Sequence, residues 1–116
     1  MLFRSVGQGA IGLETRADDA ATRALVAMID DRNTATAIAA ERAFLAALDG
    51  SCRTPIGGHA VVRGRTIRFR GMIAKPDGSR SFEVVREGGR EHATELGADA
   101  GRELRDRAGA DFFVRI

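Results

Sequence analysis

The amino-acid sequence predicts an α+β fold, in which a three-stranded antiparallel sheet is covered by helices and preceded by a strand–helix segment. Two observations lead to this prediction. Alternating apolar and polar residues occur in consecutive segments in the middle of the chain, and helical periodicities lie before and after them. Strands grouped in this way favour a sheet with helices packed as a separate layer. The length of 116 residues corresponds to one domain or part of one.

The first predicted elements are a short strand and a helix. Residues 10–16 place Ile11 and Leu13 on one face, which predicts a strand. Asp18 and Asp19 then provide an N-cap, where acidic residues stabilise the start of a helix. The side chains that follow have the i, i+3, i+4, i+7 spacing of an amphipathic helix. They are Thr22, Leu25, Val26 and Ile29.

A second helix is predicted from about Thr34 to Asp49, after a break at residues 30–33. Its apolar arc is wide, so we expect it to pack against a sheet or another helix. Gly50 is the expected C′ residue, because glycine readily adopts the left-handed conformation that ends a helix.

The rest of the chain predicts three strands and a last helix. Residues 60–62 lead through an Arg-Gly-Arg turn into a strand over 66–73, whose outer face carries arginines. Residues 76–79, Pro-Asp-Gly-Ser, predict a turn. A third strand follows from Phe82 to Glu87, and then a helix from about Ala93 to Gly109. The tail over 111–116 is apolar enough to dock on the domain.

Composition and charge exclude several classes of protein. No apolar run approaches the roughly 18 residues that cross a bilayer, and the N-terminus lacks the apolar stretch of a secretory signal. We therefore expect a cytoplasmic protein that does not enter a membrane. One cysteine and two histidines do not supply a zinc site, so no metal is predicted. Lys75 is the only lysine; the abundant arginines suit anionic ligands, but a codon bias would produce the same composition.

Three further patterns have weaker support than their alternatives. The run Gly7-Gln8-Gly9-Ala10-Ile11-Gly12 matches a dinucleotide-binding motif, but that motif must follow a strand and open a helix. Cys52 and His59 could form a nucleophile and base, but no acidic orienting residue stands out. The arginines at 63, 65, 68 and 70 could bind nucleic acid. However, acidic residues are interspersed and there is no Tyr or Trp for base stacking, so a solvated sheet face is preferred.

The loop after the second helix carries the only cysteine, Cys52, between Gly50 and the pair Gly57-Gly58. Cys52 is not at a periodic apolar position, as a buried structural cysteine would more often be. Arg53 favours the nucleophilic thiolate, whereas the negative end of the preceding helix opposes it. From the residues alone, a reactive thiol and a buried structural thiol remain equally open.

The sequence around this loop resembles hydroxymethylbilane synthase, the family also called porphobilinogen deaminase. The resemblance extends from Val6 to the C-terminus and is most specific in two motifs. The first is Val6-Gly7-Gln8-Gly9-Ala10-Ile11-Gly12-Leu13-Glu14. The second is Leu48-Asp49-Gly50-Ser51-Cys52-Arg53-Thr54-Pro55-Ile56-Gly57, where the family usually has glycine in place of Ser51.

The resemblance implies a cofactor, a reaction and a domain organisation. In the family a thiol carries a dipyrromethane through a thioether, and the matching residue is Cys52; Gln8 and Gly9 match positions near the cofactor. Four porphobilinogen molecules add to the growing polypyrrole chain with loss of ammonia, which yields hydroxymethylbilane for tetrapyrrole and heme biosynthesis. The chain resembles only the C-terminal third of the family protein. Residues 1–29 then belong with the N-terminal domains, and residues 30–116 form the cofactor-anchoring domain.

The family's catalytic aspartate and most substrate-binding arginines belong to the preceding domains, so no catalytic residue is expected in this chain. The hypothesis is therefore that the chain alone is inert and that its partners are the N-terminal domains of the same enzyme, which is expected to be monomeric. The first helix should then expose Leu25, Val26 and Ile29. The alternative from a different class is a stand-alone binding module whose arginine-bearing sheet face takes an anionic ligand.

Overall fold

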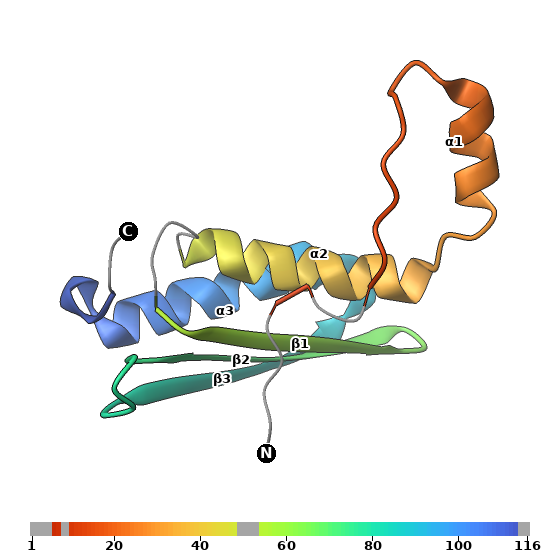
Figure 1. Cartoon of the computed structure of the whole chain (residues 1–116). Helices are drawn as coiled ribbons and strands as arrows, with labels where there is room; N and C mark the ends of the chain where they lie inside the picture. Colours follow the sequence, from red (N-terminus) through yellow and green to blue (C-terminus); the bar gives the residue numbers. More distant parts are fainter. Residues whose placement is uncertain (1–5, 8–9, 49–53, 114–116) are drawn as a thin grey trace.

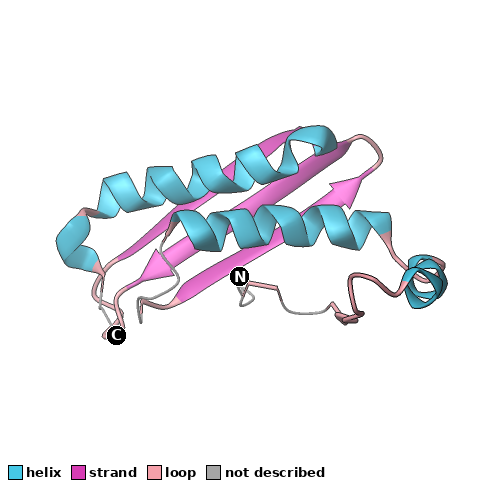
Figure 2. Ribbon diagram, turned by 90° about the horizontal axis from the view of Figure 1, so that it is seen from above, coloured by secondary structure: helices cyan, strands magenta, loops and turns pink. Residues whose placement is uncertain are grey.

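The computed structural model describes residues 6–7, 10–48 and 54–113. Within them, helices α2 (Arg32–Ala47) and α3 (Ala93–Ala108) form one layer on a sheet of three strands (Figures 1 and 2). Helix α1 (Ala20–Ala27) stands apart from this layer (Figure 1). The α+β prediction is confirmed. The strands are β1 (Ile56–Arg63), β2 (Thr66–Ala74) and β3 (Ser81–Gly89), and short 3-10 turns lie at Arg90–His92 and Ala110–Phe112.

The sheet is antiparallel throughout, in the order β1-β2-β3, so that β1 and β3 are both edge strands. A tight turn joins β1 to β2, and Gly64 has the positive φ (60°) that this turn requires. The predicted turn over 76–79 joins β2 to β3. There the carboxylate of Asp77 accepts a hydrogen bond from the Ser79 N–H (2.9 Å), and Gly78 has a φ of 75°.

The core lies between the helical layer and one face of the sheet. The inward side chains of β2, Ile67, Phe69 and Ile73, are completely buried, as their alternation predicts. Phe44 of α2 packs on Phe69 with ring centroids 4.8 Å apart. The C-terminal turn adds Phe112, which is buried against α3 and β3, so the prediction that the tail docks is confirmed for the part that the structure describes.

Helices α2 and α3 approach each other through small residues. A Cβ atom placed on Gly97 would lie 2.0 Å from the carbonyl oxygen of Ala40, and one on Gly101 would lie 2.7 Å from the Cβ of Ala47. Side chains at these two positions would therefore hold the helices apart. This close approach lets Ala100 and Leu104 of α3 be fully buried.

The N-terminal part departs from the sequence prediction. Residues 10–16 form no strand; they run as an exposed segment in which Ile11 is 93% exposed. Alternation alone cannot make a strand, because the backbone N–H and C=O groups need a neighbouring strand to pair with. Helix α1 is also shorter than predicted, although Asp19 caps it by accepting a hydrogen bond from the Thr22 N–H (3.0 Å).

Two other boundaries differ from the prediction. Helix α2 begins at Arg32, inside the expected break, because the Asp31 carboxylate accepts hydrogen bonds from the Asn33 and Thr34 N–H groups. Strand β1 begins at Ile56, so the glycine pair assigned to the cysteine loop lies in a strand. The expected C′ residue, Gly50, lies outside the described residues.

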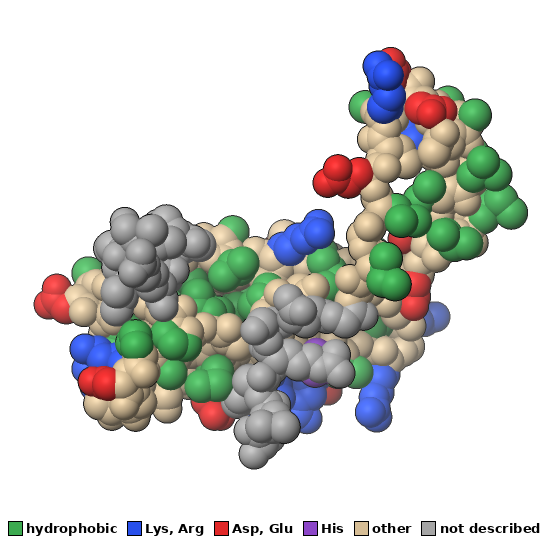
Figure 3. Space-filling model, in the orientation of Figure 1, with side chains coloured by type: hydrophobic (Ala, Val, Ile, Leu, Met, Phe, Trp, Pro, Cys, Tyr) green, Lys and Arg blue, Asp and Glu red, His purple; other side chains and the backbone are tan. Residues whose placement is uncertain are grey.

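Helix α1 buries none of its residues, and its apolar side chains gather on the part of the molecule that stands away from the sheet (Figure 3). Leu25 is 67% exposed and Ile29, just after the helix, is 73% exposed, as predicted, while Val26 is half-buried. Across the described part of the chain, no helix has the length and apolar character needed to cross a membrane.

Candidate functional site

The loop between α2 and β1 leaves the domain from two fixed points. Cys52 lies outside the described residues, as do Gln8 and Gly9. On the helix side, Leu48 is buried in the core. On the strand side, Thr54 is buried, and the Pro55 carbonyl accepts a hydrogen bond from the Ala74 N–H (3.1 Å). The two described ends of this loop, at Leu48 and Thr54, therefore both lie at the same end of the sheet, where β1 begins and β2 ends.

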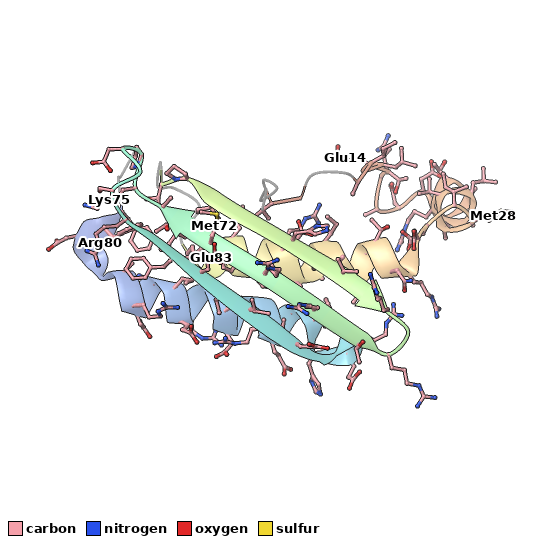
Figure 4. All side chains as sticks on the ribbon, turned by 90° about the horizontal axis from the view of Figure 1, so that it is seen from below. Glu14, Met28, Met72, Lys75, Arg80 and Glu83 are labelled. Atoms are coloured by element: carbon pink, nitrogen blue, oxygen red, sulfur yellow. The ribbon has the colours of Figure 1, made fainter. Side chains whose placement is uncertain are left out.

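Positively charged side chains surround the same end of the sheet. Strand β2 ends beside Pro55, and Lys75 follows it, with its Nζ 5.7 Å from the centre of the Phe112 ring. The guanidinium groups of Arg80 and Arg107 lie 5.2 and 5.5 Å from the centre of the Phe82 ring. Figure 4 shows Lys75 and Arg80 at the β2–β3 turn. Cations held in this way suit a ligand that carries carboxylates.

The described start of the first motif, Val6 and Gly7, lies against the edge strand β1. Gly7 adopts a positive φ (76°), and its N–H donates to the carboxylate of Glu41 (2.8 Å). The other oxygen of Glu41 accepts a hydrogen bond from the Ala60 N–H in β1 (3.2 Å). Gly58 lies under the side chain of Val6, because a Cβ on Gly58 would be 3.2 Å from the Val6 Cγ2.

Sequence reasoning missed Glu41, although the pattern contained a signal. Glu41 is four residues after Ala37 and three before Phe44, so it lies on the apolar stripe of α2. An acidic residue on a stripe that is otherwise apolar indicates a buried carboxylate with specific donors. The structure confirms this: Glu41 is only 4% exposed.

The outer face of the sheet is not uniformly basic. Across the strands, Arg68 lies between Val61 and Glu87, so an acidic residue stands opposite the arginine. In the row nearer the β2–β3 turn, Met72 lies beside Glu83 (Figure 4). This interleaving of charges argues against a sheet face that binds polyanions.

The described part of the chain contains no group of three or more His, Cys, Asp or Glu side chains that could hold a metal ion. The motif over residues 7–12 does not open a helix, because the described residues 10–19 are not helical and α1 begins only at Ala20, which leaves the dinucleotide motif without the helix that it requires.

The fold and the α2–β1 loop together define a small α+β domain that presents a loop at one end of its sheet. Comparison with known proteins identifies the family to which this domain belongs. Residues 35–106 match the family described as "Porphobilinogen deaminase, C-terminal domain". The chain belongs to this family, and the resemblance found in the sequence is confirmed.

Three curated relatives named porphobilinogen deaminase extend the match. The protein of Nitrobacter hamburgensis is 60% identical over 110 residues, which are 95% of this chain and 35% of that protein. That of Nitrobacter winogradskyi is 58% identical over 110 residues, with the same coverage. That of Paracoccus denitrificans is 52% identical over 112 residues, or 97% of this chain and 36% of the relative. The chain therefore spans about a third of the length of these relatives.

Proposed function

We propose that this chain is the cofactor-carrying C-terminal portion of a porphobilinogen deaminase. The enzyme would join four porphobilinogen molecules, with loss of ammonia, into hydroxymethylbilane, a precursor in tetrapyrrole biosynthesis. The observation that carries the proposal is the match over 110 residues at 58–60% identity to two proteins of this name. The family match over 35–106 covers the α2–β1 loop, all three strands and most of α2 and α3.

Cys52 is the proposed point of attachment for a dipyrromethane. It is the only thiol in the sequence, and its loop begins and ends at points fixed on the domain. The thiolate sulfur would attack the methylene carbon of a pyrrole that has lost ammonia: a carbon–sulfur bond replaces the carbon–nitrogen bond, and the thiol proton leaves with the ammonia. When attached, the dipyrromethane supplies the free pyrrole α-carbon that is extended. Lys75 and Arg80, near the base of the loop, fit the carboxylates of such a group.

The proposed division of the chain places residues 1–29 with the preceding part of the enzyme and residues 30–116 in the cofactor-anchoring domain. Two observations support it. Helix α1 has no buried residue, and a hollow of about 680 Å³ separates the 10–13 segment and α1 from α2. The walls of this hollow include Leu13, Val26, Ile29 and Ile38, which are apolar side chains that an adjoining domain would cover.

The chain by itself is proposed to be catalytically inert. The test compares the purified chain with a hybrid in which it replaces the 110 matched residues of the Nitrobacter hamburgensis deaminase. Porphobilinogen consumption is expected from the hybrid and not from the isolated chain. Turnover by the isolated chain would overturn the proposed inertness, and a hybrid that folds but consumes no porphobilinogen would overturn the assignment of function.

The attachment site is tested on the same hybrid. Intact mass and Ehrlich's reagent should reveal a dipyrromethane, and peptide mapping should place it on Cys52. Cys52→Ser should abolish the adduct and the activity, because a hydroxyl is a far weaker nucleophile than a thiolate. Ser51→Gly, the residue usual in the family, is the matched control and should leave both unchanged. An adduct mapped to any other residue would refute Cys52 as the anchor.

A further inference from the structure

Glu41 is a buried carboxylate that bonds to two segments far apart in the sequence. One oxygen accepts from the N–H of Gly7, 34 residues away, and the other from the N–H of Ala60, 19 residues away. An ionised side chain is rarely placed in a core unless its oxygens are hydrogen-bonded. Both oxygens of Glu41 are bonded, and both donors are main-chain groups.

The bond from Ala60 satisfies an N–H group at the edge of the sheet. Strand β1 has β2 on one side only, and Ala60 donates its N–H to Glu41 of α2, where a further strand would otherwise pair. Unpaired N–H groups on an edge strand are costly when buried. The carboxylate therefore takes the place of a neighbouring strand at this position.

The bond from Gly7 uses the same carboxylate to hold the turn at Gly7. Val6 sits over Gly58, in contact distance of the place where a side chain would begin, and close to Phe44 and Phe69 beneath it. A methyl group on Gly58 would lie 3.2 Å from the Val6 Cγ2, so that Val6 would have to shift by a few tenths of an ångström. The turn is thus seated by one apolar contact and one charge-assisted hydrogen bond.

We propose that Glu41 is a positioning residue that holds the turn at Val6 and Gly7 on the domain formed by α2 and the sheet. The structural part stands on the two hydrogen bonds alone. The part that concerns catalysis rests on the proposed function. This second part is that Gln8 and Gly9, which follow the turn in the sequence and match positions near the family's cofactor, depend on Glu41 for their position relative to the anchoring domain.

Only glutamate fits both donors. The amide of glutamine has one accepting oxygen and one NH₂ group, which can only donate. In Glu41→Gln the NH₂ group would therefore face the N–H of either Gly7 or Ala60, and that N–H would lose its acceptor. Aspartate keeps the charge but is shorter by one methylene, so Glu41→Asp would reach the two donors less well. Glu83→Gln removes the same charge from an exposed position on β3 and is the matched control.

The structural part is tested by amide hydrogen exchange and NMR on the 116-residue chain. In the unaltered chain, a scalar coupling across the hydrogen bond should connect the Gly7 nitrogen to the Glu41 carboxylate carbon, and this measurement needs no variant. In Glu41→Gln, the Gly7 amide should exchange at least tenfold faster, while the Phe69 amide in β2 and all amides of Glu83→Gln stay unchanged. An absent coupling, or unchanged Gly7 exchange in Glu41→Gln, would overturn the proposal.

The catalytic part is tested in the hybrid deaminase, with kcat expressed per molecule that carries the pyrrole adduct. Glu41→Gln should lower this kcat at least tenfold, Glu41→Asp should lower it less, and Glu83→Gln should leave it unchanged. A purely structural residue would lower the adduct-loaded fraction and leave kcat per loaded molecule intact, which would refute positioning. If the unaltered hybrid is inactive while the Gly7–Glu41 coupling is present, the proposed function fails and the structural part stands.

Discussion

The contact between α2 and α3 at Gly97 gives a prediction whose size can be worked out from the structure. In Gly97→Ala, the new Cβ would lie 2.0 Å from the carbonyl oxygen of Ala40, 2.8 Å from its carbonyl carbon and 3.0 Å from its Cα. All three are backbone atoms, so no side-chain rotation relieves the clash. To bring the shortest separation to 3.0 Å, the helices must move apart by about 1 Å, the difference between 3.0 and 2.0 Å.

Two opposing effects set the change in the free energy of unfolding. Overpacking of a core costs about 1–3 kcal/mol, and the upper end applies where backbone meets backbone, since neither helix can yield locally. Replacing glycine by alanine inside a helix returns about 1 kcal/mol through helix propensity. The overpacking is larger, so Gly97→Ala should destabilise the domain by about 2 kcal/mol.

Urea unfolding followed by circular dichroism measures this change as a lower midpoint with an unaltered slope. Gly12→Ala is the control, because a Cβ at Gly12 meets no atom within 4 Å, and it should change stability by less than about 0.5 kcal/mol. A Gly97→Ala variant that is as stable as the unaltered chain, or more stable, would show that α2 and α3 are not packed as closely as described.

Three further outcomes are expected. Arg86→Leu should cost about 0.5–1 kcal/mol at neutral pH, because Arg86 pairs with the partly exposed Glu103. The hydrogen bond from Arg86 lowers the pKa of Glu103 below 4.5. The stability difference between Arg86→Leu and the unaltered chain should therefore be present above pH 4.5 and disappear as the pH falls through the folded-state pKa of Glu103. A stability difference that stays constant down to pH 2 would contradict this prediction. Asp31→Ala should lower the urea midpoint, because it removes the acceptor for the N–H groups of Asn33 and Thr34. Asp31→Asn should largely retain the midpoint, because the asparagine side-chain oxygen can also accept from them; equal midpoints for both variants would rule out the cap. Because Leu25 and Ile29 are exposed, we expect the chain to self-associate through α1 and the residues that follow it, and Leu25→Ser combined with Ile29→Ser should reduce this association in sedimentation velocity. A monodisperse, unaltered chain at high concentration would disprove the expectation.

Much of the fold could be predicted from the sequence because its signals are local. The alternation of Ile67 and Phe69 with arginines predicted β2, and the Pro-Asp-Gly-Ser turn at 76–79 predicted where β2 gives way to β3. Gly109 was predicted to end the last helix, and it has the positive φ (82°) of a helix-terminating glycine. Each of these signals depends on residues within one or two turns of the chain.

The candidate site was predicted less completely. The family motif around Cys52 identified a loop and its proposed chemistry, and that assignment stays a prediction to be tested on the protein. The sequence did not indicate that Gly57 and Gly58 lie in β1, because glycine pairs usually mark loops. The structure shows that Gly58 is paired in β1 and that Val6, Phe44 and Phe69 crowd the space where its side chain would begin, so this glycine serves packing and not a turn.

The sequence by itself determined the approximate positions of the helices and of the three sheet strands, which of their faces are apolar, and which family the chain resembles. Only the tertiary structure decided that residues 10–16 form no strand, that α2 and α3 meet closely at Gly97 and Gly101, and that Glu41 joins the Gly7 turn to β1. The physical reason is the same in each case. A strand partner, a helix contact and a buried carboxylate all depend on which distant segment lies opposite, and periodicity within a few residues carries no information about that.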